Sequence, residues 1–163
     1  MITIRTARLA DVPTVTKLWD EFMKYQANLV ARENPRARLS WTRRPNSLPS
    51  YAKWARKNIR SSTGNVLIAE VDGKVAGYSL IYVLTLPPVF RIHRLGHIGE
   101  LFVKEKYRGL GVSSKLYEEA AKWFRRKRLQ HLSLVVIKGN DLPHSIYEKW
   151  GFFDNFIEMR KKL

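Results

Sequence analysis

Two glycines and two serines lie between Tyr107 and Leu116, where the sequence reads YRGLGVSSKL. A strongly apolar stretch comes before this segment. Small residues between a strand and a helix leave backbone N–H groups accessible, and the helix start adds the positive end of its dipole. Arg108 adds a positive charge beside these donors. The segment is therefore a candidate site for a phosphate or diphosphate, and an ordinary tight strand-to-helix turn is the alternative.

Two common phosphate-binding motifs do not match this segment. The P-loop requires G-x-x-x-x-G-K-[ST], which GLGVSSK does not supply. The dinucleotide fingerprint requires G-x-G-x-x-G, but Ser114 stands at the third glycine position. The next predicted strand, HLSLVVI, also lacks the acidic residue that would bind a ribose. Both interpretations are excluded by the residues themselves.

Length and composition indicate one domain over residues 1–163, large enough to bury a substantial core. The chain has no cysteine, which excludes disulfides, thiolate metal sites and a cysteine nucleophile, and we expect no metal site. No apolar run approaches the ~20 residues that span a bilayer, and the first residues lack the apolar core of a signal peptide. We therefore expect a cytoplasmic protein without membrane contact.

The charge is strongly basic, with 30 Lys and Arg residues against 14 Asp and Glu residues and a formal net charge of +16. An anionic partner such as nucleic acid or a phosphorylated cofactor would explain this excess. A solvated, heat-adapted surface would explain it equally, because the basic residues are spread along the whole chain. Composition alone leaves both explanations open.

Apolar periodicity predicts a sheet interrupted by helices. Asp11 is predicted to cap the first helix, and Asp72-Gly73 is a strong hairpin turn. The longest clear helix has an apolar face formed by Val112, Leu116, Ala120 and Phe124. The expected elements are strand 2–7, helices 11–31 and 50–60, strands 65–71, 74–86 and 97–105, helix 110–128, strand 131–137, helix 142–150 and strand 152–162.

Two separate segments resemble the GNAT family of N-acetyltransferases. Arg108 to Ser113 resembles the family signature R/Q-x-x-G-x-G/A, with Ser113 where Gly or Ala is usual. Gly139 to Phe152 resembles its N-x-x-A-x-x-L-Y-E-K-x-G-F segment, with Asn140 and Tyr147 in matching places and Pro143 where Ala is usual. The specific match lies between about Glu100 and Phe152, and the element order agrees with it.

The resemblance implies an α/β (α+β) fold: a mixed, mostly antiparallel sheet whose fourth and fifth strands splay apart, with helices on both faces. It implies acetyl-CoA as co-substrate, with its pantetheine arm between the splayed strands and its diphosphate on the glycine turn. A local bulge near residues 101–103 would free backbone donors there. The implied acetyl-CoA-binding residues are Leu101, Phe102, Val103, Arg108, Gly109, Leu110, Gly111, Val112, Ser113, Ser114 and Asn140.

The chemistry implied is direct attack of an amine on the thioester, which needs a base, oxyanion donors and an acid for the leaving thiolate. Glu100 is the leading candidate base, because this strand of the family borders the acceptor side. His93 and His97 are the alternatives, since histidine titrates near neutral pH. Tyr147 is the candidate acid, and a core tyrosine is its structural alternative.

The acceptor is expected to be an amine, either on a small metabolite or on a protein. The glutamate that some protein N-terminal acetyltransferases of the family carry on strand five is absent, because Leu134, Val135 and Val136 occupy that strand. The alternative function is a CoA-binding or nucleic-acid-associated basic module without catalysis, suggested by aromatic residues interleaved with Arg and Lys. A homodimer is a further expectation taken from the resemblance.

Overall fold

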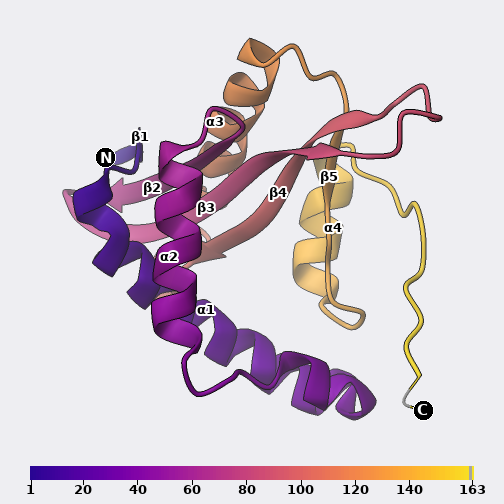
Figure 1. The fold of residues 1–163 in the computed structure, drawn as a ribbon. Coiled ribbons are helices and arrows are strands. Elements are labelled where there is room, and N and C mark those ends of the chain that lie inside the picture. The colour runs from indigo at the N-terminus through magenta and orange to yellow at the C-terminus, as the bar shows by residue number, and fades with distance from the viewer. Residues whose placement is uncertain (162) are drawn as a thin grey trace.

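The structure is a computed structural model that describes residues 1–161 and 163 (Figure 1). Its strands and helices follow the predicted order up to the last helix, and three short 3₁₀ segments join them. The elements are β1 (Ile2–Thr6), η1 (Leu9–Asp11), α1 (Val12–Glu33), η2 (Pro35–Trp41), α2 (Ser47–Arg60), β2 (Gly64–Val71), β3 (Lys74–Thr85), β4 (Arg94–Val103), η3 (Glu105–Tyr107), α3 (Val112–Arg126), β5 (Leu132–Leu134) and α4 (Asp141–Lys149).

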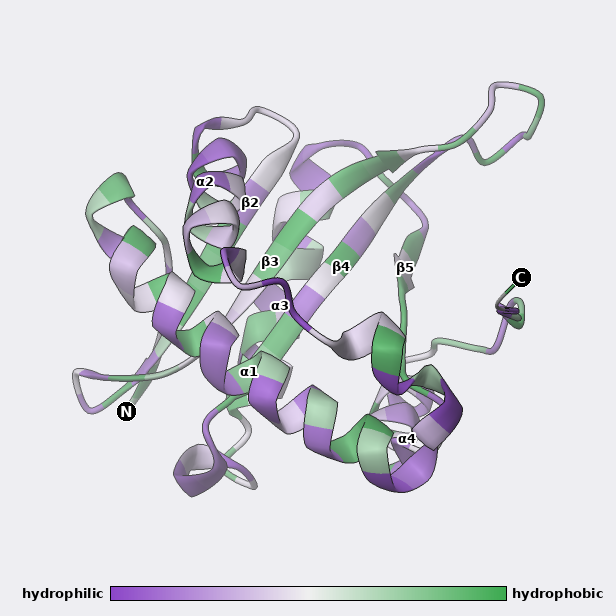
Figure 2. Cartoon of the chain, turned by 60° about the horizontal axis from the view of Figure 1, so that its bottom comes forward, coloured by the Kyte–Doolittle hydropathy of each residue, from purple (hydrophilic) through white to green (hydrophobic). Residues whose placement is uncertain are grey.

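The strands form one sheet in the order β1-β2-β3-β4-β5, antiparallel throughout except for the parallel pair β4–β5. Alternate residues of each strand face opposite sides of the sheet. Leu18, Tyr51 and Ala55 of α1 and α2 pack on one face, whereas Leu116 and Phe124 of α3 pack on the other. The predicted fold class is therefore confirmed, with helices on both faces (Figures 1 and 2).

The hairpin between β2 and β3 turns at the predicted residues. Asp72 and Gly73 both have positive φ, 48° and 73°, as the tight turn of a two-residue hairpin requires. The predicted apolar face of α3 is also confirmed, because Val112, Leu116 and Phe124 are each at most 1% exposed. Local periodicity therefore identified both the hairpin and the main helix.

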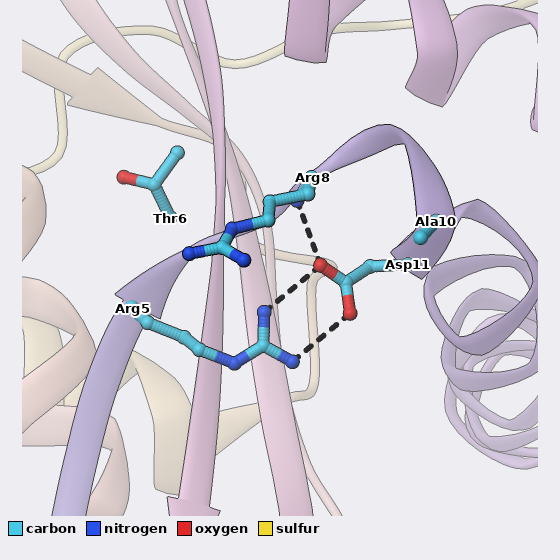
Figure 3. Close-up of a pocket in the computed structure, with 5 residues that line it drawn as sticks. All are labelled: Arg5, Thr6, Arg8, Ala10 and Asp11. Atoms are coloured by element: carbon cyan, nitrogen blue, oxygen red, sulfur yellow. Dashed lines mark hydrogen bonds and ion pairs between the residues drawn. The ribbon is translucent and has the colours of Figure 1, made fainter.

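The start of α1 differs from the prediction in how Asp11 is used. Asp11 stands at the N-cap position, but its side chain makes no capping hydrogen bond to the helix. Its carboxylate instead accepts two hydrogen bonds from Arg5, at 2.8 and 2.9 Å, and one from the Arg8 amide. Arg5 also pairs with Glu70 at 2.8 Å. The surface hollow that Arg5, Arg8 and Asp11 help to line (Figure 3) is therefore part of a structural ion-pair cluster.

The predicted final strand over residues 152–162 is wrong for the residues that the structure describes. Residues 152–161 form no strand or helix and run outside the sheet (Figure 1). The preceding strand is also shorter than predicted, because β5 covers only Leu132–Leu134. So short an edge offers little to pair with, and apolar side chains of the tail such as Phe153 and Ile157 stay exposed.

None of the helices in the part of the chain that the structure describes is long and apolar enough to span a lipid bilayer.

Candidate active site

Strands β4 and β5 separate after a short paired stretch. Gly96, His97 and Ile98 pair with Leu132 to Leu134, and β5 then ends while β4 continues to Val103. Residues 99–103 of β4 therefore have β3 on one side and no strand partner on the other. This is the predicted splay, and it leaves an unpaired strand edge in the middle of the molecule.

A β-bulge at Gly99 decides which amides face this gap. The register of β3 against β4 shifts between Leu80, which pairs with Glu100, and Ile81, which pairs with Ile98. Amides of alternate residues in a strand point to opposite sides. Before the bulge the Gly96 amide points to β5 and donates to His131, whereas after it the Lys104 amide points to β3 and donates to Ala76.

It follows that the amides of Leu101 and Val103 point away from β3, into the gap. The bulge was predicted within residues 101–103, and the structure places it at Gly99 instead. Its effect is still the expected one, because the reversed alternation presents these two N–H groups to whatever occupies the gap.

The glycine turn leaves its backbone donors free. Gly109 and Gly111 have φ of 76° and 82°, and a Cβ atom added to either would meet nothing within 4 Å. Among the described residues, no main-chain N–H from Gly109 to Ser114 donates to a carbonyl outside the helix. The amide of Lys115 is the first after these that donates a main-chain hydrogen bond, to the Gly111 carbonyl at 3.1 Å. The first turn of α3 thus presents unpaired donors and its positive dipole end to open space.

Arg108 is fixed beside this turn. Its Nε donates to the Val103 carbonyl at 3.2 Å, and its guanidinium lies 4.8 Å from the ring centroid of Tyr25 in α1. The guanidinium is therefore held between the end of β4 and α1, on the residue that precedes the first glycine of the turn. Phe102, Val103 and Val112 are buried, so these three predicted acetyl-CoA-binding residues can contribute only main-chain groups.

Glu100 projects from the bulge to the α1 and α2 side of the sheet. Its Oε2 accepts a hydrogen bond from Tyr51 at 2.5 Å and another from Tyr78 at 2.8 Å. Desolvation by burial raises the pKa of Glu100 to about 7, and the two tyrosine hydrogen bonds oppose that rise. A carboxyl group with a pKa near neutrality and partial exposure is suited to accept a proton at physiological pH.

The histidines are placed differently from Glu100. His93 is exposed before β4 begins. His97 is half-buried, its Nδ1 lies 2.8 Å from the Ser133 hydroxyl, and burial lowers its pKa. The ring of Tyr82 lies against His97, with centroids 5.0 Å apart. His97 therefore stands at the fork of β4 and β5, whereas His93 lies away from the gap.

Tyr147 lies in an aromatic cluster on α4. Its ring centroid is 5.6 Å from that of Trp150, which stacks on Tyr117 of α3 at 4.4 Å. Burial raises the pKa of Tyr147, which keeps its hydroxyl protonated. Asn140 is buried just before α4, and its side chain makes no capping hydrogen bond to that helix. The geometry is compatible with both predicted roles and assigns neither.

Sequence reasoning missed the two tyrosines that hold Glu100. Tyr51 lies in the predicted helix 50–60 and Tyr78 in the predicted strand 74–86, and the structure confirms both elements. The contact between Tyr51 and Glu100 joins residues 49 positions apart in the chain, and no spacing rule predicts it. The only available signal was a tyrosine on an otherwise apolar face, since a buried hydroxyl needs a partner.

A family model described as the Acetyltransferase (GNAT) family matches residues 26–152, which is most of the chain. The chain belongs to the GNAT acetyltransferase family. The matched range includes the separated strands, the glycine turn and α4, so the GNAT family pattern covers the whole candidate site.

Two curated relatives agree with the GNAT assignment. An uncharacterized N-acetyltransferase of Archaeoglobus fulgidus is 30% identical over 104 residues, which are 64% of this chain and 68% of the relative. An N-alpha-acetyltransferase of Sulfurisphaera tokodaii is 25% identical over 154 residues, which are 91% of this chain and 78% of the relative. Among solved structures, a predicted acetyltransferase of Clostridium acetobutylicum with acetyl-CoA has a TM-score of 0.76 at 18% identity, covering 98% of this chain and 96% of that one.

Proposed function

We propose that this GNAT family member transfers an acetyl group from acetyl-CoA to an amine in a ternary complex. The observation that carries the proposal is that unpaired amides and a carboxyl group both lie beside the gap between β4 and β5. Unpaired N–H groups of the glycine turn and of Leu101 and Val103 lie on the cofactor side. The carboxyl group of Glu100, with a pKa of about 7, lies on the face covered by α1 and α2.

The glycine turn and Arg108 would hold the diphosphate of acetyl-CoA. The N–H groups from Gly109 to Ser114 supply hydrogen bonds and the α3 dipole adds a favourable potential. The amides of Leu101 and Val103 would hold polar atoms of the pantetheine arm and of the acetyl carbonyl. Acetyl-CoA supplies the activated acyl thioester when it is bound.

Glu100 accepts a proton from the acceptor, because an amine with a pKa near ~10 must lose a proton before it can attack. Glu100 passes this proton to solvent. The nitrogen then bonds to the acetyl carbon and loses its second proton to the Glu100 carboxylate, and the carbon–sulfur bond breaks, which gives an acetamide and CoA thiolate. Leu101 or Val103 donates to the carbonyl oxygen as negative charge develops there. Tyr147 donates its proton to the thiolate and recovers it from solvent.

The acceptor is proposed only as an amine, on a small molecule or on a protein. The Sulfurisphaera relative named N-alpha-acetyltransferase supports testing protein N-termini. Tyr51, which bonds Glu100, stacks on Trp19, and Arg43 lies 5.5 Å from the Trp19 centroid. Aromatic rings and a cation close to Glu100 suit an acceptor that is partly apolar or acidic.

A thiol-release assay tests the proposal directly. Because the chain contains no cysteine, a thiol reagent reports only the CoA that is set free. The purified protein is incubated with acetyl-CoA and a panel of small amines and of peptides with free N-termini. We expect amine-dependent thiol release, with the acetylated amine identified by mass. If no amine raises thiol release above the rate without acceptor, the proposed function is wrong.

A further inference from the structure

Gln26 is a polar residue in the buried stripe of α1. It is 9% exposed, and its Oε1 is the only fully buried side-chain polar atom in the described residues that has no hydrogen-bond partner. Leaving a buried acceptor unpaired costs about 1–3 kcal/mol. Turning the amide over would put an unpaired N–H in the same place, so the need for a partner would remain.

Two residues close to Gln26 in α1 contact the end of β4 and Arg108. Phe22, one helical turn earlier, packs on Phe102 near the end of β4, with ring centroids 5.7 Å apart. The preceding residue, Tyr25, lies under the guanidinium of Arg108. Toward its C-terminus α1 reaches the segment that follows β5, and it runs across to α4 in Figure 2.

That last contact is close, because a Cβ atom added to Gly139 would lie 2.8 Å from Glu33 Cβ. The stretch of α1 from Phe22 to Glu33, which includes Gln26, therefore contacts the end of β4, Arg108 beside the glycine turn and the segment following β5. On the proposed function, these three segments surround the path of the pantetheine arm from the diphosphate to the thioester.

The hydrogen-bonding groups along this path are unbalanced. A pantetheine arm carries two secondary amides, so it brings two N–H donors as well as two carbonyl acceptors. Leu101 and Val103 offer N–H groups, which suit the carbonyls. The Val103 carbonyl already accepts a hydrogen bond from Arg108. The Leu101 carbonyl, which points the same way as its amide, is the other acceptor that residues 101 and 103 offer, so one of the two N–H groups needs an acceptor from another element.

We propose that Gln26 Oε1 accepts a hydrogen bond from an amide N–H of the pantetheine arm. The inference rests on the proposed function and adds a residue of α1, outside the two motif segments, to the acetyl-CoA site. It explains why a glutamine stands unpaired in an otherwise apolar stripe: its partner arrives with the ligand. Gln26 is thus a binding residue, and it takes no part in proton transfer.

The test compares two ligands that differ in the pantetheine arm. Acetyl-CoA and 3′-phosphoadenosine 5′-diphosphate share the nucleotide and the diphosphate, but only the first carries the arm. Affinities of the wild-type protein and of Gln26→Met are measured by calorimetry. Methionine conserves the volume of glutamine and removes both polar ends. Gln26→Leu is the second variant should the first fail to fold.

We expect Gln26→Met to bind acetyl-CoA about five- to tenfold more weakly, the loss of one net hydrogen bond, and to bind the diphosphate nucleotide unchanged. Its melting temperature should equal or exceed that of the wild type, since an unpaired buried acceptor is removed. Asn65→Leu is the control: Asn65 is buried but bonded to Val66 N at 2.8 Å. That variant should melt lower without a selective loss of acetyl-CoA binding.

Equal acetyl-CoA affinity in the wild type and in Gln26→Met would overturn the inference and leave the proposed function standing. Equal weakening of both ligands would also overturn it, because that pattern indicates a general structural role. A wild-type protein that binds neither ligand would overturn the proposed function together with the inference.

Discussion

Tyr78 donates a hydrogen bond of 2.8 Å to Oε2 of Glu100 from a position that is 0% exposed. Tyr51 donates to the same oxygen from α2. Two phenols therefore fix one carboxylate oxygen, and Oε1 is left to receive a proton. The arrangement joins β3, β4 and α2 at one side chain, next to the bulge at Gly99, and would hold Glu100 rigidly in its proposed role as the base.

Replacing Glu100 by Gln should lower kcat/KM by about 10²-fold or more, the usual contribution of a general base. The rise in rate with a midpoint near pH 7, the pKa of this carboxyl group, should also disappear. Glutamine keeps an acceptor oxygen for both tyrosines, so the fold is retained. A variant that keeps the wild-type rise would remove Glu100 from the mechanism and direct attention to His97.

The stability of the fold should depend on the same carboxyl group. Its pKa rises from about 4.5 to about 7 on folding, so the native state binds this proton more tightly than the unfolded chain. Stability therefore falls as pH increases from 4.5 to 7 and is level beyond that. Through this group the wild type should lose about 2 kcal/mol of its free energy of unfolding over that range, a figure that allows for the partial exposure of Glu100. Glu100→Gln should not show this loss. Urea unfolding at pH 5 and pH 8 measures this, and parallel changes in both proteins would contradict it.

Removing one phenol should move the pH profile. The Tyr51 and Tyr78 hydrogen bonds lower the pKa of Glu100 against the desolvation that raises it. Tyr51→Phe deletes one donor and should shift the midpoint of kcat/KM to higher pH, and Tyr78→Phe should shift it in the same direction. The measurement is the pH dependence of kcat/KM for all three proteins. An unmoved midpoint in both variants would show that Glu100 is not the titrating group.

Tyr147→Phe should lower kcat about 10- to 100-fold and leave the KM for acetyl-CoA nearly unchanged, because a proton donor acts mainly in the transition state. Tyr117→Phe is the matched control, since Tyr117 belongs to the same aromatic cluster through its stack with Trp150. That control should be fully active. Equal kcat in Tyr147→Phe and wild type would leave Tyr147 as a packing residue.

Features encoded by neighbouring residues were predictable from the sequence. The hairpin at Asp72-Gly73 and the apolar face of α3 depend on local backbone preferences and on helical spacing. The free amides of the glycine turn were expected for the same reason, because a strand, small residues and a helix start follow one another in the chain; the anion that they would bind stays a prediction. The splay of β4 and β5 came from the family resemblance.

Features that depend on distant contacts were not predictable. The bulge at Gly99 is set by how β3 and β4 align, so its position was misplaced by about two residues. The pKa of Glu100 depends on burial and on two tyrosines from other elements. The final strand was predicted over residues 152–162, but a strand also needs an edge to pair with, and β5 ends at Leu134.

The central claim is that the backbone of the glycine turn binds the diphosphate of acetyl-CoA, and Gly111→Val tests it against Gly73→Val. Both glycines have positive φ, 82° and 73°, and a Cβ at either meets nothing within 4 Å, so the two variants carry similar backbone strain. Acetyl-CoA affinity is measured by calorimetry for the wild type and both variants. We expect at least a tenfold loss of affinity in Gly111→Val and wild-type affinity in Gly73→Val. Wild-type affinity in a folded Gly111→Val protein would contradict it.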